Sequence, residues 1–300
     1  MCSRPVFIAI SPVYSKIILF IKTCFNSYTK LEDIHDAILA MNTLPLDEEQ
    51  DKILLQTLCN LSALRGNQLR LIEDGVVRII ERLIVSPNPE LRALTSEVAC
   101  NLTSDQKSRS KILEHNMLKI LQNMSKDSSE YVRTACIQCY YNLSRDLFSR
   151  EKMTAAGSIP VIIKISLEKV SFQVAKVGAK TLRSLCGDIS IASYLVKEGI
   201  MRALASLVEV EDAVTRQFVA EALCSLFKSG KVLPKLIEQG AVGLVVSLSH
   251  RLENPITGEW CAFALYHLSG SGLCPGSMLV NGVLPCLIKL CYESTIVTKH

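Results

Sequence analysis

The sequence is poor in aromatic residues, glycine and proline. Phe, Trp and Tyr make up 6% of the 300 residues, and glycine and proline number only 14 and 10. Sandwiches and barrels need aromatic and β-branched strands separated by many turn residues, so this composition disfavours an all-β fold. Lys and Arg number 33 against 29 Asp and Glu. Since the basic residues form no long block, we expect no nucleic-acid partner.

The sequence also lacks a long uncharged hydrophobic run. The first 25 residues are mostly apolar, but Pro12, Lys16 and Lys22 interrupt them, and a membrane-spanning helix needs about 20 nearly charge-free residues. No clear signal cleavage site follows, and twelve cysteines in 300 residues are too sparse for a disulfide scaffold. We therefore expect no membrane span and a cytoplasmic location, with nuclear and cytoskeletal or ciliary locations as alternatives.

Catalytic and metal-binding motifs are missing as well. The sequence contains no phosphate-binding loop, no H-E-x-x-H and no G-x-S-x-G. Cys136 and Cys139 form a lone C-x-x-C without a second pair at zinc-ligand spacing, which predicts small buried packing residues. We expect no catalytic site, no cofactor and no metal.

Two motifs recur every 41 or 42 residues. The first ends in forms such as LCNLS, ACNLT and YYNLS, and its marker, here called the polar slot, is Asn60, Asn101, Asn142, Ser184, Ser225 and His267. The marker of the second, the glycine slot, is Gly75, Asn116, Gly157, Gly199, Gly240 and Gly282. The interval from polar slot to glycine slot is always 15 residues, whereas the next interval is 26 or 27. The first interval therefore predicts a rigid corner, and the second a loop that tolerates insertion.

The residue types around both slots predict helices. After Gly75, the apolar residues Val76, Ile79, Ile80 and Leu83 follow helical spacing, and glycine suits the sharp turn before them. Helix-start residues such as the N-cap type Asn88 and the following Pro89 then predict a longer helix that ends near the polar slot. The residue after each polar slot is predicted to be buried: Leu61, Leu102, Leu143, Leu185, Leu226 and Leu268.

The repeat length and the two motifs, G-x-φ-x-x-φ-φ and L-x-N-L-S/T, resemble armadillo repeats over roughly residues 34–300. The resemblance implies an all-α, armadillo-type α-solenoid: a right-handed superhelix of three-helix repeats whose third helices line a concave groove. Residues 1–33 would be an atypical capping segment, and residues 34–300 an array of about six repeats. The last repeat lacks its third helix, which predicts a fragment, a shortened isoform or a mis-ended gene model with exposed Leu284, Leu287, Ile288 and Leu290.

The groove of such an array supplies the candidate partner-binding residues. They are the six polar-slot residues and the residues four positions earlier, which share their helical face: Gln56, Glu97, Gln138, Lys180, Glu221 and Phe263. In peptide-binding armadillo families the slot asparagine bonds the peptide backbone, and only Asn60, Asn101 and Asn142 match it. The tryptophans of nuclear-import adaptors are absent from these positions, and the mixed charges do not match a basic, catenin-like groove. The alternative is that the asparagines cap or bridge adjacent helices.

These features favour a non-catalytic scaffold or adaptor that binds an extended or helical protein segment along the groove. One alternative is a structural or docking subunit of a cytoskeletal, ciliary or other large assembly that uses another surface. A second is the substrate-binding or regulatory arm of a larger ubiquitin ligase or exchange factor. The sequence leaves the partner and the oligomeric state open.

Overall fold

The computed structural model describes His35, Ile38, Asn42 and residues 47–297, except 169–170, 252–253 and 274. The predicted capping segment, residues 1–33, lies outside the described residues. Contacts divide the chain into two compact units, residues 1–120 and 121–300. All regular structure in the described residues is helical, and none of these helices is both long and apolar enough to cross a bilayer.

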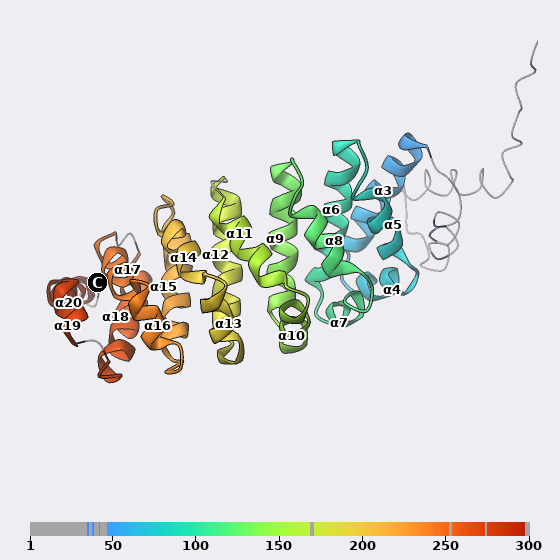
Figure 1. Cartoon of the computed structure of the whole chain (residues 1–300). Helices are drawn as coiled ribbons and strands as arrows, with labels where there is room; N and C mark the ends of the chain where they lie inside the picture. The colour runs from blue at the N-terminus through green and yellow to red at the C-terminus, as the bar shows by residue number, and fades with distance from the viewer. Residues whose placement is uncertain are drawn as a thin grey trace, which may run out of the picture. The chain divides into compact units, whose positions relative to one another are not determined.

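The helices recur as two short helices followed by a long one (Figure 1). The first helices are α4 (Asn67–Glu73), α7 (Ser108–Ile112), α10 (Leu147–Ala155), α13 (Ala192–Lys197, after the 3-10 helix Ile189–Ile191), α16 (Leu233–Glu238) and α19 (Pro275–Val280). The second helices are α5 (Val76–Leu83), α8 (Met117–Met124), α11 (Ser158–Leu167), α14 (Ile200–Val208), α17 (Ala241–His250) and α20 (Val283–Val297). The third helices are α3 (Glu48–Ala63), α6 (Pro89–Ser104), α9 (Glu130–Ser144), α12 (Phe172–Cys186), α15 (Ala213–Phe227) and α18 (Pro255–Gly270).

The predicted turn before each second helix is confirmed at the glycines. Five glycine-slot residues have positive φ, from +67° at Gly157 to +95° at Gly75, a conformation that costs other L-residues about 1–2 kcal/mol. At the start of the third helices, Asn88 accepts a hydrogen bond from the Glu90 amide (2.7 Å) and Pro89 is the first helical residue. Both features are helix-start signals that the sequence displays.

Hydrogen bonds between residues six positions apart hold the turn that follows α3, α6 and α9. The Gln68 side-chain amide donates to the Ser62 carbonyl oxygen at 2.7 Å, and the Arg150 guanidinium donates to the Ser144 carbonyl oxygen at 2.8 Å. These bonds satisfy carbonyls that the helix end leaves without a partner. An extra residue between donor and acceptor would disrupt them, which favours the interval of 15 residues in these three repeats.

The leucines that follow the polar slots form part of the core. Five of the six predicted leucines are fully buried, whereas Leu61 is only half-buried. Leu290 is also buried, contrary to the prediction, because the side of α20 that carries it faces the other helices, whereas Leu284 and Ile288 are exposed as expected. Third helices pack side by side within each unit: α3 with α6 in the first, and α9, α12, α15 and α18 in succession in the second (Figure 1).

Candidate partner-binding surface

In the first unit, one polar-slot asparagine bridges two third helices. The Asn101 side-chain amide on α6 donates to the Ser62 hydroxyl oxygen at 3.1 Å and to the Cys59 carbonyl oxygen at 3.3 Å, both on α3. Asn60 is exposed, as is Glu97, and Gln56 is half-buried. At Asn101 the structure therefore shows the bridging role that the sequence left as an alternative.

In the second unit the slot residues also make internal hydrogen bonds. The Ser184 hydroxyl on α12 donates to the Ser144 carbonyl oxygen on α9 at 3.1 Å. Asn142 is buried and accepts from the Gln138 side chain at 3.0 Å. The Ser225 hydroxyl donates to a carbonyl of its own helix at 2.9 Å. His267 is half-buried beside Tyr266.

The residues four positions before the slots carry the more varied chemistry. The Lys180 ammonium lies 4.1 Å from the centroid of the Tyr141 ring. Glu221 is almost fully buried and forms an ion pair with Arg183. Phe263 is exposed, with its ring centroid 5.9 Å from that of Trp260.

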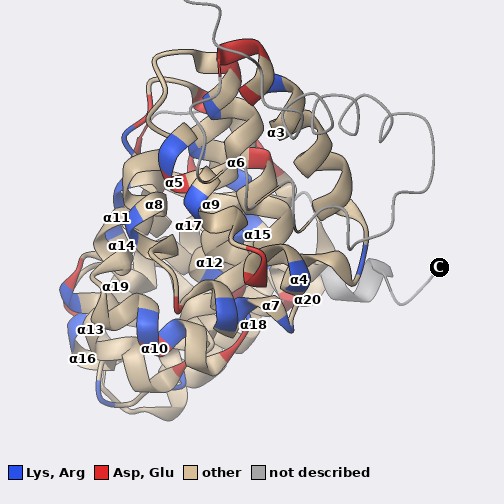
Figure 2. Cartoon of the chain, turned by 90° about the vertical axis from the view of Figure 1, so that its right-hand side faces the viewer, with Lys and Arg blue, Asp and Glu red and all other residues tan. Residues whose placement is uncertain are grey.

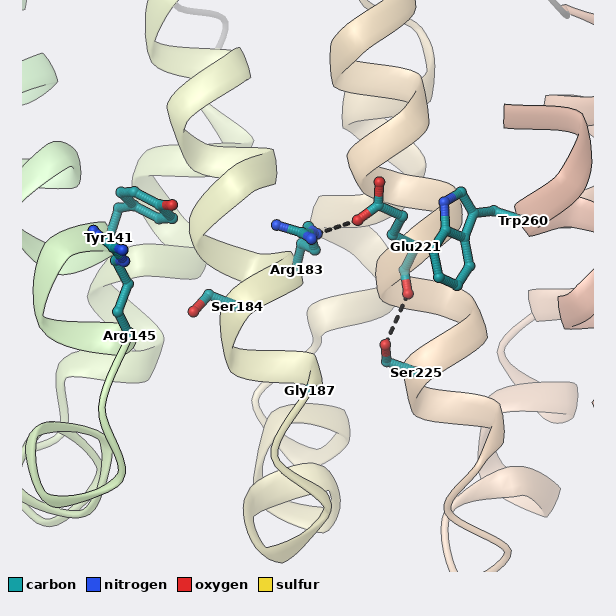
Figure 3. A pocket seen from close by; sticks show the side chains of 8 residues that line it. All are labelled: Tyr141, Arg145, Arg183, Ser184, Gly187, Glu221, Ser225 and Trp260. Atoms are coloured by element: carbon teal, nitrogen blue, oxygen red, sulfur yellow. Dashed lines mark hydrogen bonds and ion pairs between the residues drawn. The ribbon is translucent and has the colours of Figure 1, made fainter. Parts of the chain in front are cut away.

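A shallow cavity of about 380 Å³ opens along this row of helices (Figure 3). Its lining combines three predicted residues with five others, in the order Tyr141, Arg145, Arg183, Ser184, Gly187, Glu221, Ser225 and Trp260. Figure 3 shows Arg183 and Glu221 pointing toward each other between α12 and α15, with Trp260 beyond Glu221. The candidate set omitted Tyr141, Arg145 and Trp260 because it followed two slot positions alone. Tyr141 lies one position before the polar slot Asn142, and Arg145 lies three positions after it. A candidate set that included these two positions would have contained both residues.

The charges around this cavity are unbalanced. Arg183 is neutralised by Glu221 and also lies over the Phe218 ring, 5.7 Å from its centroid. Arg145 lies 6.0 Å from the Tyr141 centroid, and Lys180 faces the same ring. Within the described residues neither Arg145 nor Lys180 has a carboxylate within ion-pair distance. Elsewhere Lys and Arg are scattered among Asp and Glu over the visible helices (Figure 2); what distinguishes Arg145 and Lys180 is that both lie against the Tyr141 ring.

The cysteine pair behaves as packing residues. Cys136 and Cys139 are both fully buried in α9, and burial raises the pKa of the Cys136 thiol, which favours the neutral form. No group of three His, Cys, Asp or Glu side chains suited to a metal ion occurs among the described residues. The prediction of buried packing cysteines is confirmed.

No protein-family model matches the sequence, and no curated protein matches it. Solved structures do match. A computationally designed armadillo repeat protein for modular peptide recognition is 18% identical with a TM-score of 0.70, and the match covers 77% of this chain and 98% of that one. A designed armadillo repeat protein in complex with the peptide (KR)4 is 18% identical with a TM-score of 0.69, over 77% and 97%. An engineered protein reaches a TM-score of 0.74 at 15% identity, over 93% and 74%. The chain therefore has the armadillo-repeat fold, and the predicted fold class is confirmed.

Proposed function

We propose that this armadillo-fold chain is a binding scaffold whose α9–α18 face holds an extended segment of a partner protein. The observation that carries the proposal is the cavity between Tyr141 and Trp260, with two cations nearby that no carboxylate of the described residues neutralises. Aromatic faces and convergent polar groups in a concave site are typical of ligand-binding surfaces. The proposal is further supported by two similar folds, one designed for peptide recognition and one in complex with a peptide.

The charges indicate what kind of segment would bind. A carboxylate placed between Arg145 and Lys180 would form charge-assisted hydrogen bonds with both, whereas a basic peptide such as (KR)4 would be repelled at this point. Helices pack about 8–10 Å apart, so the three spacings from α9 to α18 cover about 27 Å. An extended chain advances about 3.3 Å per residue. The bound segment would therefore contain about eight residues, with an acidic side chain toward the α9 end.

A display selection with random 12-residue peptides on the intact chain tests this proposal. We expect enriched peptides to contain Asp or Glu, and their binding to weaken about tenfold or more in the double variant Arg145→Glu, Lys180→Glu. The matched control is Lys197→Glu, Arg202→Glu, which makes the same charge change at exposed residues of α13 and α14.

Three outcomes decide the matter. Loss of binding in the first variant alone supports the proposed surface. Equal binding by both variants would show that the peptide binds to another surface of the chain. If no peptide is enriched at all, the peptide-binding function itself is rejected.

A further inference from the structure

Two cations from neighbouring third helices converge on the ring of Tyr141. The guanidinium of Arg145, the C-cap residue of α9, lies 6.0 Å from the centroid of this ring, and the Lys180 ammonium of α12 lies 4.1 Å from it. Since both distances are measured from one centroid, the two charges are no more than about 10 Å apart. An anion placed between them would contact both and relieve their mutual repulsion.

The same three positions carry no such pair of cations in the other repeats. They are the residues three after and one before a polar slot, and the residue four before the next slot. One repeat later they are Gly187, Arg183 and Glu221, whose charges cancel. The remaining sets carry at most one cation: Ala63, Cys59, Glu97; Ser104, Cys100, Gln138; and Lys228, Cys224, Phe263. The two-cation set therefore occurs at one place only among the intervals between polar slots.

Both cations keep their hydrogen-bond donors for a ligand. Within the part of the chain that the structure describes, the contacts of the Arg145 guanidinium and the Lys180 ammonium are those with the Tyr141 ring. Glu221, the carboxylate of the cavity lining, is paired with Arg183 (Figure 3). These two cations are therefore available to one incoming anion.

A phosphate monoester matches this arrangement better than a carboxylate does. It carries a charge of about −1.5 to −2 at pH 7 and three strong acceptor oxygens, so it neutralises both cations at once. The planar guanidinium of Arg145 suits two parallel hydrogen bonds to phosphate oxygens, and the Lys180 ammonium acts as a point charge. A single Asp or Glu side chain would leave one of the two charges uncompensated. Because Arg and Lys are both long side chains, a short phosphorylated side chain suffices to meet them.

We infer that the α9 end of the proposed peptide face binds a phosphoserine or phosphothreonine of the partner segment. This inference rests on the proposed function and specifies the acidic group expected at that end. The phosphate oxygens accept hydrogen bonds from Arg145 and Lys180 beside the Tyr141 ring. Phosphorylation of the partner therefore controls how tightly its segment binds.

Matched pools of 12-residue peptides test the inference. Their sequences are random except at one central position, which is phosphoserine in the first pool, glutamate in the second and serine in the third. Mass spectrometry measures the fraction of each pool that the immobilised intact chain retains. We expect the phosphoserine pool to be retained about tenfold more than the glutamate pool, since one further charge-assisted hydrogen bond contributes on this scale.

Neutral substitutions locate the phosphate. Arg145→Gln, Lys180→Gln should abolish the excess retention of the phosphoserine pool. The control Lys197→Gln, Arg202→Gln removes two exposed cations of α13 and α14 and should preserve it. An excess that survives in the first variant would place the phosphate elsewhere and overturn the inference.

The remaining outcomes separate this inference from the proposed function. Equal retention of the phosphoserine and glutamate pools, both above the serine pool, would overturn the phosphate site but leave the acidic segment in place. Retention of no pool would reject both. Vesicles of phosphatidylcholine and phosphatidylinositol phosphate provide a last arm: if they bind the chain while the phosphoserine pool does not, the two cations serve a lipid headgroup and the inference is overturned.

Discussion

The side-chain amide of Asn101 donates a hydrogen bond to the hydroxyl oxygen of Ser62, 3.1 Å away on the neighbouring third helix. The same amide reaches the Cys59 carbonyl oxygen. A slot asparagine in this chain therefore has a structural task that does not require a bound partner. Asn60, in the same slot one repeat earlier, is exposed, so the two residues allow the structural role to be measured separately.

Asn101→Ala should destabilise the α3–α6 contact by about 1–2 kcal/mol, because it leaves acceptors in a part-buried interface without a donor. Native-state hydrogen exchange of the α3 and α6 amides measures this local loss. Asn60→Ala, the matched control, should change the exchange free energies by less than about 0.5 kcal/mol. Equal effects of the two substitutions would show that the bridge contributes little.

Leu143→Ala should lower the free energy of unfolding by about 2–5 kcal/mol, since Leu143 is fully buried and the substitution leaves a cavity. Denaturant titration followed by circular dichroism measures the loss. Leu61→Ala deletes the same atoms from a half-buried position and should cost clearly less. A loss below about 1 kcal/mol at Leu143 would contradict the packing described here.

Glu221→Gln should strengthen binding of an acidic peptide selected on the intact chain by about threefold or more, because Arg183 loses the carboxylate that neutralises it. Fluorescence anisotropy with that peptide measures the change. Glu211→Gln removes the same charge from an exposed loop and should have a smaller effect. Weaker binding in Glu221→Gln would indicate that Glu221 itself contacts the ligand.

The buried cysteines predict a pH dependence of stability. Burial raises the pKa of the Cys261 thiol from about 9 to about 12, and that of Cys59 likewise to about 12. Near pH 7 both thiols are almost entirely neutral whether the chain is folded or unfolded. As the pH rises from 9 to 12 the unfolded chain loses these protons first, so the free energy of unfolding should fall. Urea titrations across this range measure the fall, and Cys261→Ala should make it shallower.

The same burial predicts selective alkylation. At pH 8.5, iodoacetamide should modify the exposed Cys291 well before the buried Cys136 or Cys139. Peptide mapping by mass spectrometry gives the order. Modification of Cys136 as fast as Cys291 would mean that α9 opens readily or is less buried than described.

The sequence predicted the features that recur in register. Gly157 and Leu143 recur as residue types because each repeat needs the same left-handed turn and the same buried leucine, and a spacing analysis detects such recurrence. Tyr141 recurs only as Tyr266, and Arg145 and Trp260 do not recur as residue types, so recurrence of residue type does not single them out. Their meeting in one cavity depends on how four third helices pack side by side, which the spacing alone does not specify.

Exposure was harder to predict than helix position. Leu290 follows the same apolar pattern as Leu284, yet it is buried while Leu284 is exposed. The two differ in the side of α20 on which they lie, and only the neighbouring helices determine which side is covered. Similarly, the sequence gives the position of Asn101 but not its partners, since Cys59 and Ser62 lie about 40 residues earlier.

The rigid corner and the adjustable loop divide each repeat into a part that fixes the register and a part that can change length. Because the bonds from Gln68 to Ser62 and from Arg150 to Ser144 close the corner, foreign residues added there would pull donor and acceptor apart. In the loop between α5 and α6, the Arg92 guanidinium of α6 donates to the Ser86 and Pro87 carbonyl oxygens at 2.8 and 3.1 Å, so the end of the loop next to α6 is held as well. Val85 lies ahead of these bonds and is exposed, so it is the natural graft site for an epitope tag or a protease cleavage sequence in this chain.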